Sequence, residues 1–272
     1  MLKRNPLPGF GLSLGYTLLY LSIIVLLPLA ALVLNALNLS WEEFWKWTTN
    51  DRAISAYKLT FGASLCAALL NTLFGVLTAW VLVRYDFPGR RFLDALVDFP
   101  FALPTAVAGL TLAELFSSQG WIGKLLEPLG MKLVFSPIGV IIALTFVGMP
   151  FVIRTLQPVI ESLDKEIEEA AAILGATRIK TFTSIIFPTL FPTIITGFSL
   201  AFARAIGEYG SIVFISGNIP YKTEIAPVLI VMRLEEYNYA GATAIAVILL
   251  ILSFLLLAII NWLQGWAQKI AE

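Results

Sequence analysis

The chain has 272 residues, of which 58% are hydrophobic and 13% are charged, against about 25% charged in a typical soluble domain. Its 18 basic and 18 acidic residues cancel, so nothing indicates a nucleic-acid partner. The absence of histidine and the single cysteine, Cys66, exclude histidine catalysis or ligation, an intrachain disulfide and a cysteine metal cluster. We therefore expect a polytopic membrane protein without a metal site, a cofactor or catalytic residues of its own.

Six apolar runs are long enough to cross a bilayer, which takes about 20 helical residues each. No alternating strand pattern appears, and helices satisfy their backbone hydrogen bonds internally in lipid. The sequence therefore predicts an all-α, polytopic membrane bundle of about six transmembrane helices, and we expect residues 1–272 to form a single transmembrane domain. The predicted spans cover residues 12–36, 57–83, 93–117, 134–156, 186–214 and 240–264.

Basic residues close to the span ends predict the orientation, because they favour the cytoplasmic side. They concentrate in the N-terminal tail and in the connections after the second and fourth spans. We therefore expect both termini and the segment 157–185 to be cytoplasmic. The residues concerned are Lys3, Arg4, Arg84, Arg90, Arg91, Arg154, Lys165, Arg178 and Lys180.

Prolines interrupt the third and fifth spans, where Pro100, Pro104, Pro188 and Pro192 fall. A proline removes a helical hydrogen bond, and broken membrane helices occur where the backbone lines a cavity or packs on protein. The third and fifth spans are therefore candidates for a translocation pathway. Pro188 and Pro192 fit the simple start of the fifth span equally well.

Two charges, Arg204 and Glu208, lie four residues apart in the fifth span and are predicted to share one helix face. Intramembrane charges are costly and often functional. A mutual ion pair with a structural role is the favoured interpretation, and a pathway or gating role is the alternative. Serine and threonine also serve helix packing in membranes. The remaining candidates for the pathway or gate are Pro104, Thr105, Ser199 and Ser211.

A polar insert, residues 157–188, separates the fourth and fifth spans. Ser162 is a plausible helix N-cap, and Gly175 suits the left-handed residue that ends a helix. An apolar stripe precedes Gly175 and a second one leads to Pro188, so the sequence predicts two short helices meeting at a bend. The polar face is acidic and would be repelled by anionic lipid, which favours a protein partner. The first stripe consists of Leu163, Ile167, Ala170, Ala171 and Leu174.

The run Glu169-Ala170-Ala171, then Gly175, Ile185 and Phe187-Pro188, resembles the EAA loop of binding-protein-dependent ABC importer permeases, with Phe187 replacing the usual leucine. In that family the loop is a coupling helix that docks into a cleft on a cytoplasmic ATPase. The chain has no G-x-x-x-x-G-K-[ST] loop, so ATP and Mg²⁺ would be bound by the partner. The resemblance implies a coupling role for Glu166, Glu169, Ala170, Ala171, Leu174, Gly175 and Ala176.

Further stretches narrow the resemblance. Residues 86–91 (DFPGRR), 99–110 (FPFALPTAVAGL) and 207–211 (GEYGS) resemble the sulfate and molybdate branch of type I importers. Residues 215–218 (ISGN), 223–225 (TEI) and 239–244 (YAGATA) are similar to the T-subunit family of sulfate/thiosulfate permeases. The resemblance implies a type I ABC importer permease fold in a bacterial inner membrane or a plastid inner envelope.

The same resemblance implies the partners: a homologous second permease subunit, two ATPase subunits and an external sulfate- or thiosulfate-binding protein. A molybdate or tungstate permease remains an alternative. A secondary anion transporter is a further alternative, although such proteins often carry an inverted repeat and an ionisable relay, and the sequence shows neither.

Overall fold

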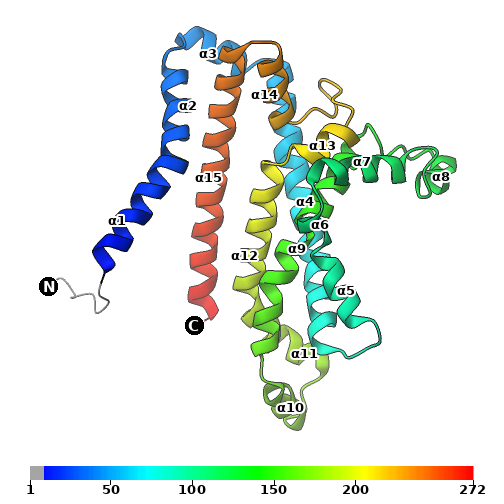
Figure 1. Cartoon of the computed structure of the whole chain (residues 1–272). Helices are drawn as coiled ribbons and strands as arrows, with labels where there is room; N and C mark the ends of the chain where they lie inside the picture. The colour runs from blue at the N-terminus through cyan, green and yellow to red at the C-terminus, as the bar shows by residue number, and fades with distance from the viewer. Residues whose placement is uncertain (1–8, 272) are drawn as a thin grey trace.

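The computed structural model describes residues 9–271, and every regular element within that range is a helix. Lys3 and Arg4, on which the orientation prediction partly depends, lie outside the described residues, as does the side chain of Lys165. Figure 1 shows elongated helices lying roughly side by side, with α10 projecting beyond one end and α3 lying at the other. We call these the α10 end and the α3 end.

Within residues 9–271, five helices are long and apolar enough to cross a membrane. They coincide with five of the six predicted spans, although the fifth predicted span begins and ends about eight residues too late. The second of the five observed helices is α4 (Asp51–Arg84), and the third is α9 (Pro137–Ser162). The five are Phe10–Leu37, Asp51–Arg84, Pro137–Ser162, Arg178–Ile206 and Tyr239–Trp262.

Two of these five spanning helices are composite. The first joins α1 (Phe10–Leu21), a π-helical turn and α2 (Leu27–Leu37). The fourth joins α11 (Arg178–Thr181), a second π-helical turn and α12 (Phe187–Ile206). The fifth lies within α15 (Tyr239–Ala271). Two shorter helices lie at the α3 end, namely α3 itself (Trp41–Thr48) and α14 (Ala226–Glu235).

The predicted span 93–117 is wrong as a single helix. The chain forms α5 (Arg90–Val97), α6 (Phe99–Ala102) and α7 (Thr105–Phe116) instead. Leu103 is extended (φ −88°, ψ 128°), because a residue before proline is sterically disfavoured in the helical region. The 12 residues of α7 span only about 18 Å, short of the ~30 Å hydrocarbon core. Beyond α7 the chain forms the projecting α8 (Gly123–Leu126) and a 3₁₀ turn.

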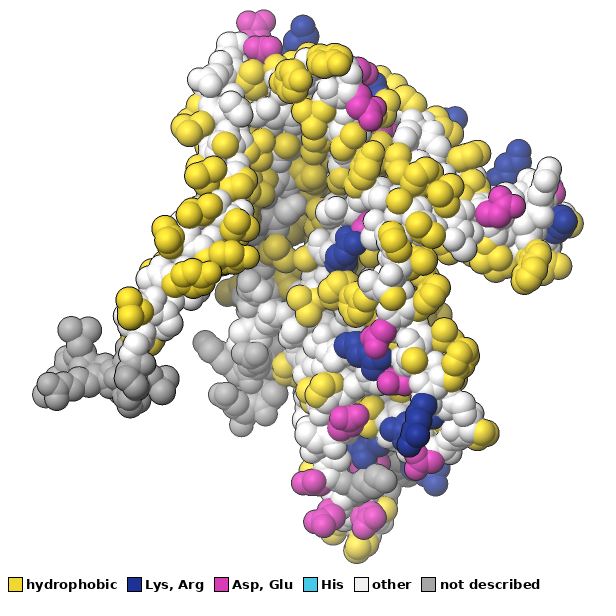
Figure 2. Space-filling model, viewed as in Figure 1, with side chains coloured by type: hydrophobic (Ala, Val, Ile, Leu, Met, Phe, Trp, Pro, Cys, Tyr) yellow, Lys and Arg dark blue, Asp and Glu magenta, His cyan; other side chains and the backbone are white. Residues whose placement is uncertain are grey.

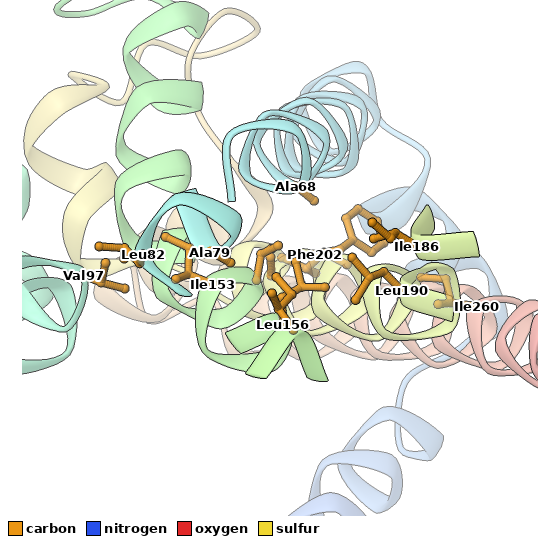
Figure 3. Close-up of a cluster of buried hydrophobic side chains, with 14 residues drawn as sticks. Ala68, Ala79, Leu82, Val97, Ile153, Leu156, Ile186, Leu190, Phe202 and Ile260 are labelled. Atoms are coloured by element: carbon orange, nitrogen blue, oxygen red, sulfur yellow. The ribbon is translucent and has the colours of Figure 1, made fainter. Parts of the chain in front are cut away.

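The core lies where α4, α9 and α12 pack together (Figure 3). Leu156 of α9 and Leu190 of α12 are fully buried there, with Phe202 of α12 and Ile260 of α15 beside them. Small residues on α4 permit the close approach. A Cβ added to Gly75 would lie 2.8 Å from Val152 Cγ1 of α9. Lipid provides little hydrophobic driving force for helix association, so membrane helices associate through close packing at such small residues.

The outer surface is strongly apolar. The first spanning helix buries none of its most apolar window, and its α2 half packs against α15. Figure 2 shows hydrophobic side chains over this helix, while charged side chains lie toward the α10 end, at the α3 end and around α8. Exposed Leu, Ile and Phe side chains in such numbers fit a surface solvated by lipid.

Candidate functional site

The coupling segment is built around α10 (Lys165–Ile173), which projects from the α10 end of the molecule (Figure 1). Asp164 is the N-cap residue in extended conformation, and Glu166 and Glu168 lie in the first turn, where carboxylates favour the positive end of the helix dipole. The predicted cap, Ser162, is wrong. It is the last residue of α9, and its hydroxyl donates to the Val159 carbonyl at 2.8 Å.

The end of α10 is a Schellman motif centred on Gly175. Gly175 has φ +80°, a conformation that glycine adopts without the penalty paid by other residues. The Ala176 amide donates to the Ala171 carbonyl at 3.0 Å, and the Gly175 amide donates to the Ala172 carbonyl at 3.0 Å. The left-handed cap predicted at Gly175 is therefore confirmed, and it turns the chain sharply back toward α11.

The turn displays apolar side chains to the outside. Ile173 and Leu174 are each 87% exposed at the tip of the segment. Among the predicted coupling residues, Ala171 is buried and Ala176 half-buried, and the other five, Glu166, Glu169, Ala170, Leu174 and Gly175, are exposed. Ile173 was missed by the sequence analysis, although its place beside Leu174, just before the capping glycine, could have indicated it. An exposed apolar tip with an acidic flank is a suitable contact surface for another protein.

The second helix of the insert is not short. Thr177 caps α11 by accepting a hydrogen bond from the Lys180 amide at 3.3 Å. The helix then continues through a π-helical turn, past Pro188 and Pro192, to Ile206. The prediction of two short helices is therefore half wrong, because the second is the beginning of a 29-residue spanning helix. The Gly175 bend is thus separated from a membrane helix only by Ala176 and Thr177.

The second candidate region is a crossing of two short helices, α7 and α13 (Gly210–Ile215), in the part of the bundle nearer the α3 end. Their backbones touch through two glycines. A Cβ on Gly109 would lie 2.3 Å from the Ser211 carbonyl oxygen, and a Cβ on Gly210 would lie 2.2 Å from Thr105 Oγ1. The structure therefore brings the predicted pathway residues Thr105 and Ser211 to the same crossing.

An ion pair between Arg204 and Glu208 lies next to this crossing. Because α12 ends at Ile206, Glu208 follows the helix end, and the expectation of one shared helix face is corrected. One Glu208 oxygen accepts from the amide and the hydroxyl of Ser211, both at 3.0 Å. The Glu208 side chain is 2% exposed and that of Arg204 is 33% exposed. The carboxylate therefore joins the end of α12 to the start of α13.

Two predicted pathway residues lie apart from this arrangement. Ser199 is buried between α12 and α15, where its hydroxyl donates to the Ile195 carbonyl at 2.6 Å and accepts from Gln264 Nε2 at 3.1 Å. Pro104 is exposed and precedes the first turn of α7, where its lack of an N–H costs nothing. Ser199 is thus engaged in helix–helix bonding, and Pro104 breaks the third apolar run.

The sequence analysis missed a polar cluster around Arg154 of α9. Its guanidinium pairs with Asp94 of α5 and with Asp98, each at 2.7 Å, and also contacts Gln157 Oε1 at 2.6 Å. The cluster fastens α5 and the α5–α6 junction to α9. The sequence did contain a signal for this cluster. The predicted spans include Arg154, Asp94 and Asp98, and charges inside a membrane are costly unless they are paired.

Known proteins share this sequence and this architecture. The family described as "Binding-protein-dependent transport system inner membrane component" matches residues 71–269. "Sulfate transport system permease protein CysT" of Salmonella typhimurium is 50% identical over 263 residues, covering 97% of this chain and 95% of that protein. The protein of the same name from Synechocystis sp. is 52% identical over 256 residues, covering 94% and 90%.

A solved structure shows the same fold at low sequence identity. It is that of a bacterial alginate ABC transporter in complex with alginate pentasaccharide-bound periplasmic protein. The TM-score is 0.77 at 21% identity, with 96% of this chain and 94% of that chain covered. The sequence matches show that the chain belongs to the family of binding-protein-dependent transport system inner membrane components.

Proposed function

We propose that this chain is the membrane-spanning permease subunit of an ATP-driven, binding-protein-dependent importer of sulfate, with thiosulfate as a second substrate. The observation that carries the proposal is 50% and 52% identity, over nearly the full chain, to proteins named as sulfate transport permeases. These relatives favour sulfate over molybdate or tungstate, and the family match sets aside a secondary transporter. The whole chain acts as one permease domain, with residues 157–188 as its coupling insert.

Energy must come from outside the chain. Moving a dianion inward against an inside-negative potential costs about 4–5 kcal/mol per 100 mV. ATP hydrolysis by two partner ATPase subunits supplies it, and α10 with its Gly175 bend is the surface on which one of them docks. The exposed Ile173 and Leu174 enter a groove of the ATPase, flanked by Glu166 and Glu169. ATP and Mg²⁺ are held by those partners.

The other partners follow from the family and from the exposed apolar surface of the bundle. A homologous second permease subunit completes the translocation path, and an external sulfate- or thiosulfate-binding protein delivers the anion to the α3 end. The α10 end faces the cytoplasm of a bacterium or the stroma of a plastid. The start of α1 and the end of α15 lie toward this same end, which supports cytoplasmic termini (Figure 1).

The α7–α13 crossing is the part of the chain best suited to line or gate the path, because discontinuous helices meet there and pack against the spanning helix α9. Within it, Thr105 lies close to Gly210, and Ser211 supplies a neutral polar group to Glu208. The Arg204–Glu208 pair holds the break between α12 and α13, since Glu208 also accepts two hydrogen bonds from Ser211. A neutralised pair attracts an anion weakly and so permits its release.

The test is radiolabelled sulfate uptake in cells that lack this gene and carry a plasmid-borne copy. We expect Glu169→Lys and Gly175→Val to abolish uptake and co-purification of the ATPase subunits, with the chain still present in membranes. The first inverts the charge of the docking surface, and the second places a β-branched residue at φ +80°. Asp86→Lys also inverts the charge of an acid at the α10 end, but Asp86 lies outside α10 and its side chain is 96% exposed, so this variant should leave uptake normal.

Competition then tests the substrate. Excess thiosulfate should reduce sulfate uptake, and excess molybdate should not. Normal uptake by Glu169→Lys would refute the coupling role of α10. If the plasmid-borne wild-type gene restores molybdate uptake but not sulfate uptake, sulfate is refuted as the substrate. The assignment as a permease would still stand.

A further inference from the structure

The coupling helix stands away from the membrane bundle. A cavity of about 560 Å³ separates α10 and α11 from the end of α4. Its walls include Trp80 and Tyr85 on one side and Glu168, Glu169 and Ala172 on the other. There are no packed protein atoms in this cavity to transmit a displacement of α10. Such a displacement can reach the membrane helices only along the chain or through contacts that bridge the cavity.

One side chain makes such a bridge. Arg84 is the last residue of α4, and its side chain is only 10% exposed. Its Nη2 atom lies 3.0 Å from Glu168 Oε1 of α10 and donates to the Leu163 carbonyl at 3.1 Å. Leu163 is the C-cap residue of α9. A single guanidinium therefore contacts the ends of α4 and α9 and the coupling helix.

The same side chain is connected to α12. The Arg84 guanidinium lies over the Trp80 ring, 5.3 Å from its centroid, and Trp80 packs edge-to-face on Phe182 at 6.0 Å. Phe182 is the first residue of the π-helical turn that leads into α12. The three helices of the core and α10 thus converge on one cation and its supporting aromatic pair.

The chemistry of arginine suits this position. The C-terminal end of α9 carries partial negative charge on its free carbonyls, and Glu168 carries a full one, so a cation between them is attracted to both. A planar guanidinium can donate to a carbonyl and lie against a carboxylate while stacking on an indole, whereas a lysine ammonium is a point charge on a flexible stem.

We infer that Arg84 is a positioning residue that transmits the movement of the coupling helix to the membrane helices α4 and α9. This inference rests on the proposed function, in which α10 receives the movement of the ATPase. When Glu168 is displaced, Arg84 draws the ends of α4 and α9 with it, and Trp80 carries the displacement to Phe182. The role is distinct from docking, because Arg84 lies behind α10 and not on its exposed tip.

A neighbouring pair provides the matched control. Arg90 and Asp86 form an ion pair at 2.6 Å at the same end, but the two residues are four apart and the Asp86 side chain is 96% exposed. The pair connects neither α10 nor two core helices to each other, so it cannot transmit a displacement of α10 to the membrane helices. Exposed pairs of this kind contribute little to stability.

The experiment reconstitutes the purified complex of this chain, its permease partner and its ATPase subunits in liposomes with the external binding protein. ATP hydrolysis and radiolabelled sulfate uptake are measured on the same vesicles. We expect Arg84→Ala and Glu168→Gln each to lower the sulfate moved per ATP about tenfold, the scale of coupling between two linked sites. Arg84→Lys should recover part of the loss, and Arg90→Ala should match the wild type.

Co-purification separates this inference from the proposed function. Arg84→Ala and the milder Glu168→Gln should still bind the ATPase subunits, and hydrolysis should continue. An unchanged ratio of sulfate to ATP in both variants, or loss of ATPase binding by both, would overturn the inference and leave the proposed function intact. A wild-type complex that neither binds the ATPase nor carries sulfate would overturn the proposed function itself.

Discussion

Replacing Gly109 by alanine should disrupt the α7–α13 crossing. The new Cβ would lie 2.3 Å from the Ser211 carbonyl oxygen and 2.8 Å from the Ser211 carbonyl carbon and Cα. Carbon–oxygen contacts ordinarily begin near 3.3 Å, so the two helices must separate by about 1 Å. All three obstructing atoms belong to the backbone, and no side-chain rotation can relieve the overlap.

The expected loss of stability follows from two opposing effects. Overpacking a tight site costs about 1–3 kcal/mol, and an overlap with rigid backbone falls at the upper end. Alanine in place of glycine within a helix returns about 1 kcal/mol. The net expectation is a destabilisation of about 2 kcal/mol for Gly109→Ala. Sulfate uptake should fall as well, because the displaced α13 carries Ser211, whose amide and hydroxyl bind Glu208.

The assay is equilibrium unfolding of the purified chain in mixed detergent micelles with increasing SDS. Gly62→Ala is the matched control, since Gly62 also lies inside a helix and an added Cβ there meets nothing within 4 Å. That variant should gain about 0.5–1 kcal/mol, so the two variants should differ by about 3 kcal/mol. Equal stability of Gly109→Ala and Gly62→Ala would refute the close crossing of α7 and α13.

Two further ion pairs give predictions of their own. Arg204→Ala should destabilise the chain by about 3 kcal/mol, because Glu208 stays buried without its partner. Arg204→Lys should cost less. Adding Glu208→Gln to Arg204→Ala should restore part of the lost stability. Strict additivity in that double-mutant cycle would contradict the pair. Arg52 holds the buried Glu224 through two hydrogen bonds of 2.8 and 2.7 Å, so Glu224→Ala should loosen the segment between α13 and α14 and speed tryptic cleavage after the exposed Lys222. Cleavage at the wild-type rate would show that the segment is held by other contacts.

The spans were predictable where apolarity and length coincide. Five long apolar runs became five spanning helices, because a continuous helix is the only structure that satisfies an isolated backbone in lipid. The run 93–117 has the same composition but packs on α9 and α13, so its backbone could break at Leu103 and Pro104. Average hydropathy does not distinguish apolar residues facing lipid from apolar residues facing protein.

The candidate sites were predictable only as far as their determinants are local. The bend at Gly175 depends on six consecutive residues, and the sequence predicted it. The partnership of Arg204 and Glu208 follows from their spacing, although Glu208 turned out to lie beyond the helix. Arg84 could not be predicted in the same way, because its partners Leu163 and Glu168 are about 80 residues away and only the packing of α4 on α9 brings them together.

The broken third run has a consequence for how the chain is made. Membrane insertion during synthesis selects segments that can span on their own, and the 12 residues of α7 are too few to do so. Its main neighbour, α13, begins about a hundred residues later in the chain. We therefore expect α7 to wait at the insertion machinery or in the bilayer interface until α13 has been translated. The order of synthesis thus makes the α7–α13 crossing one of the last parts of the protein to form.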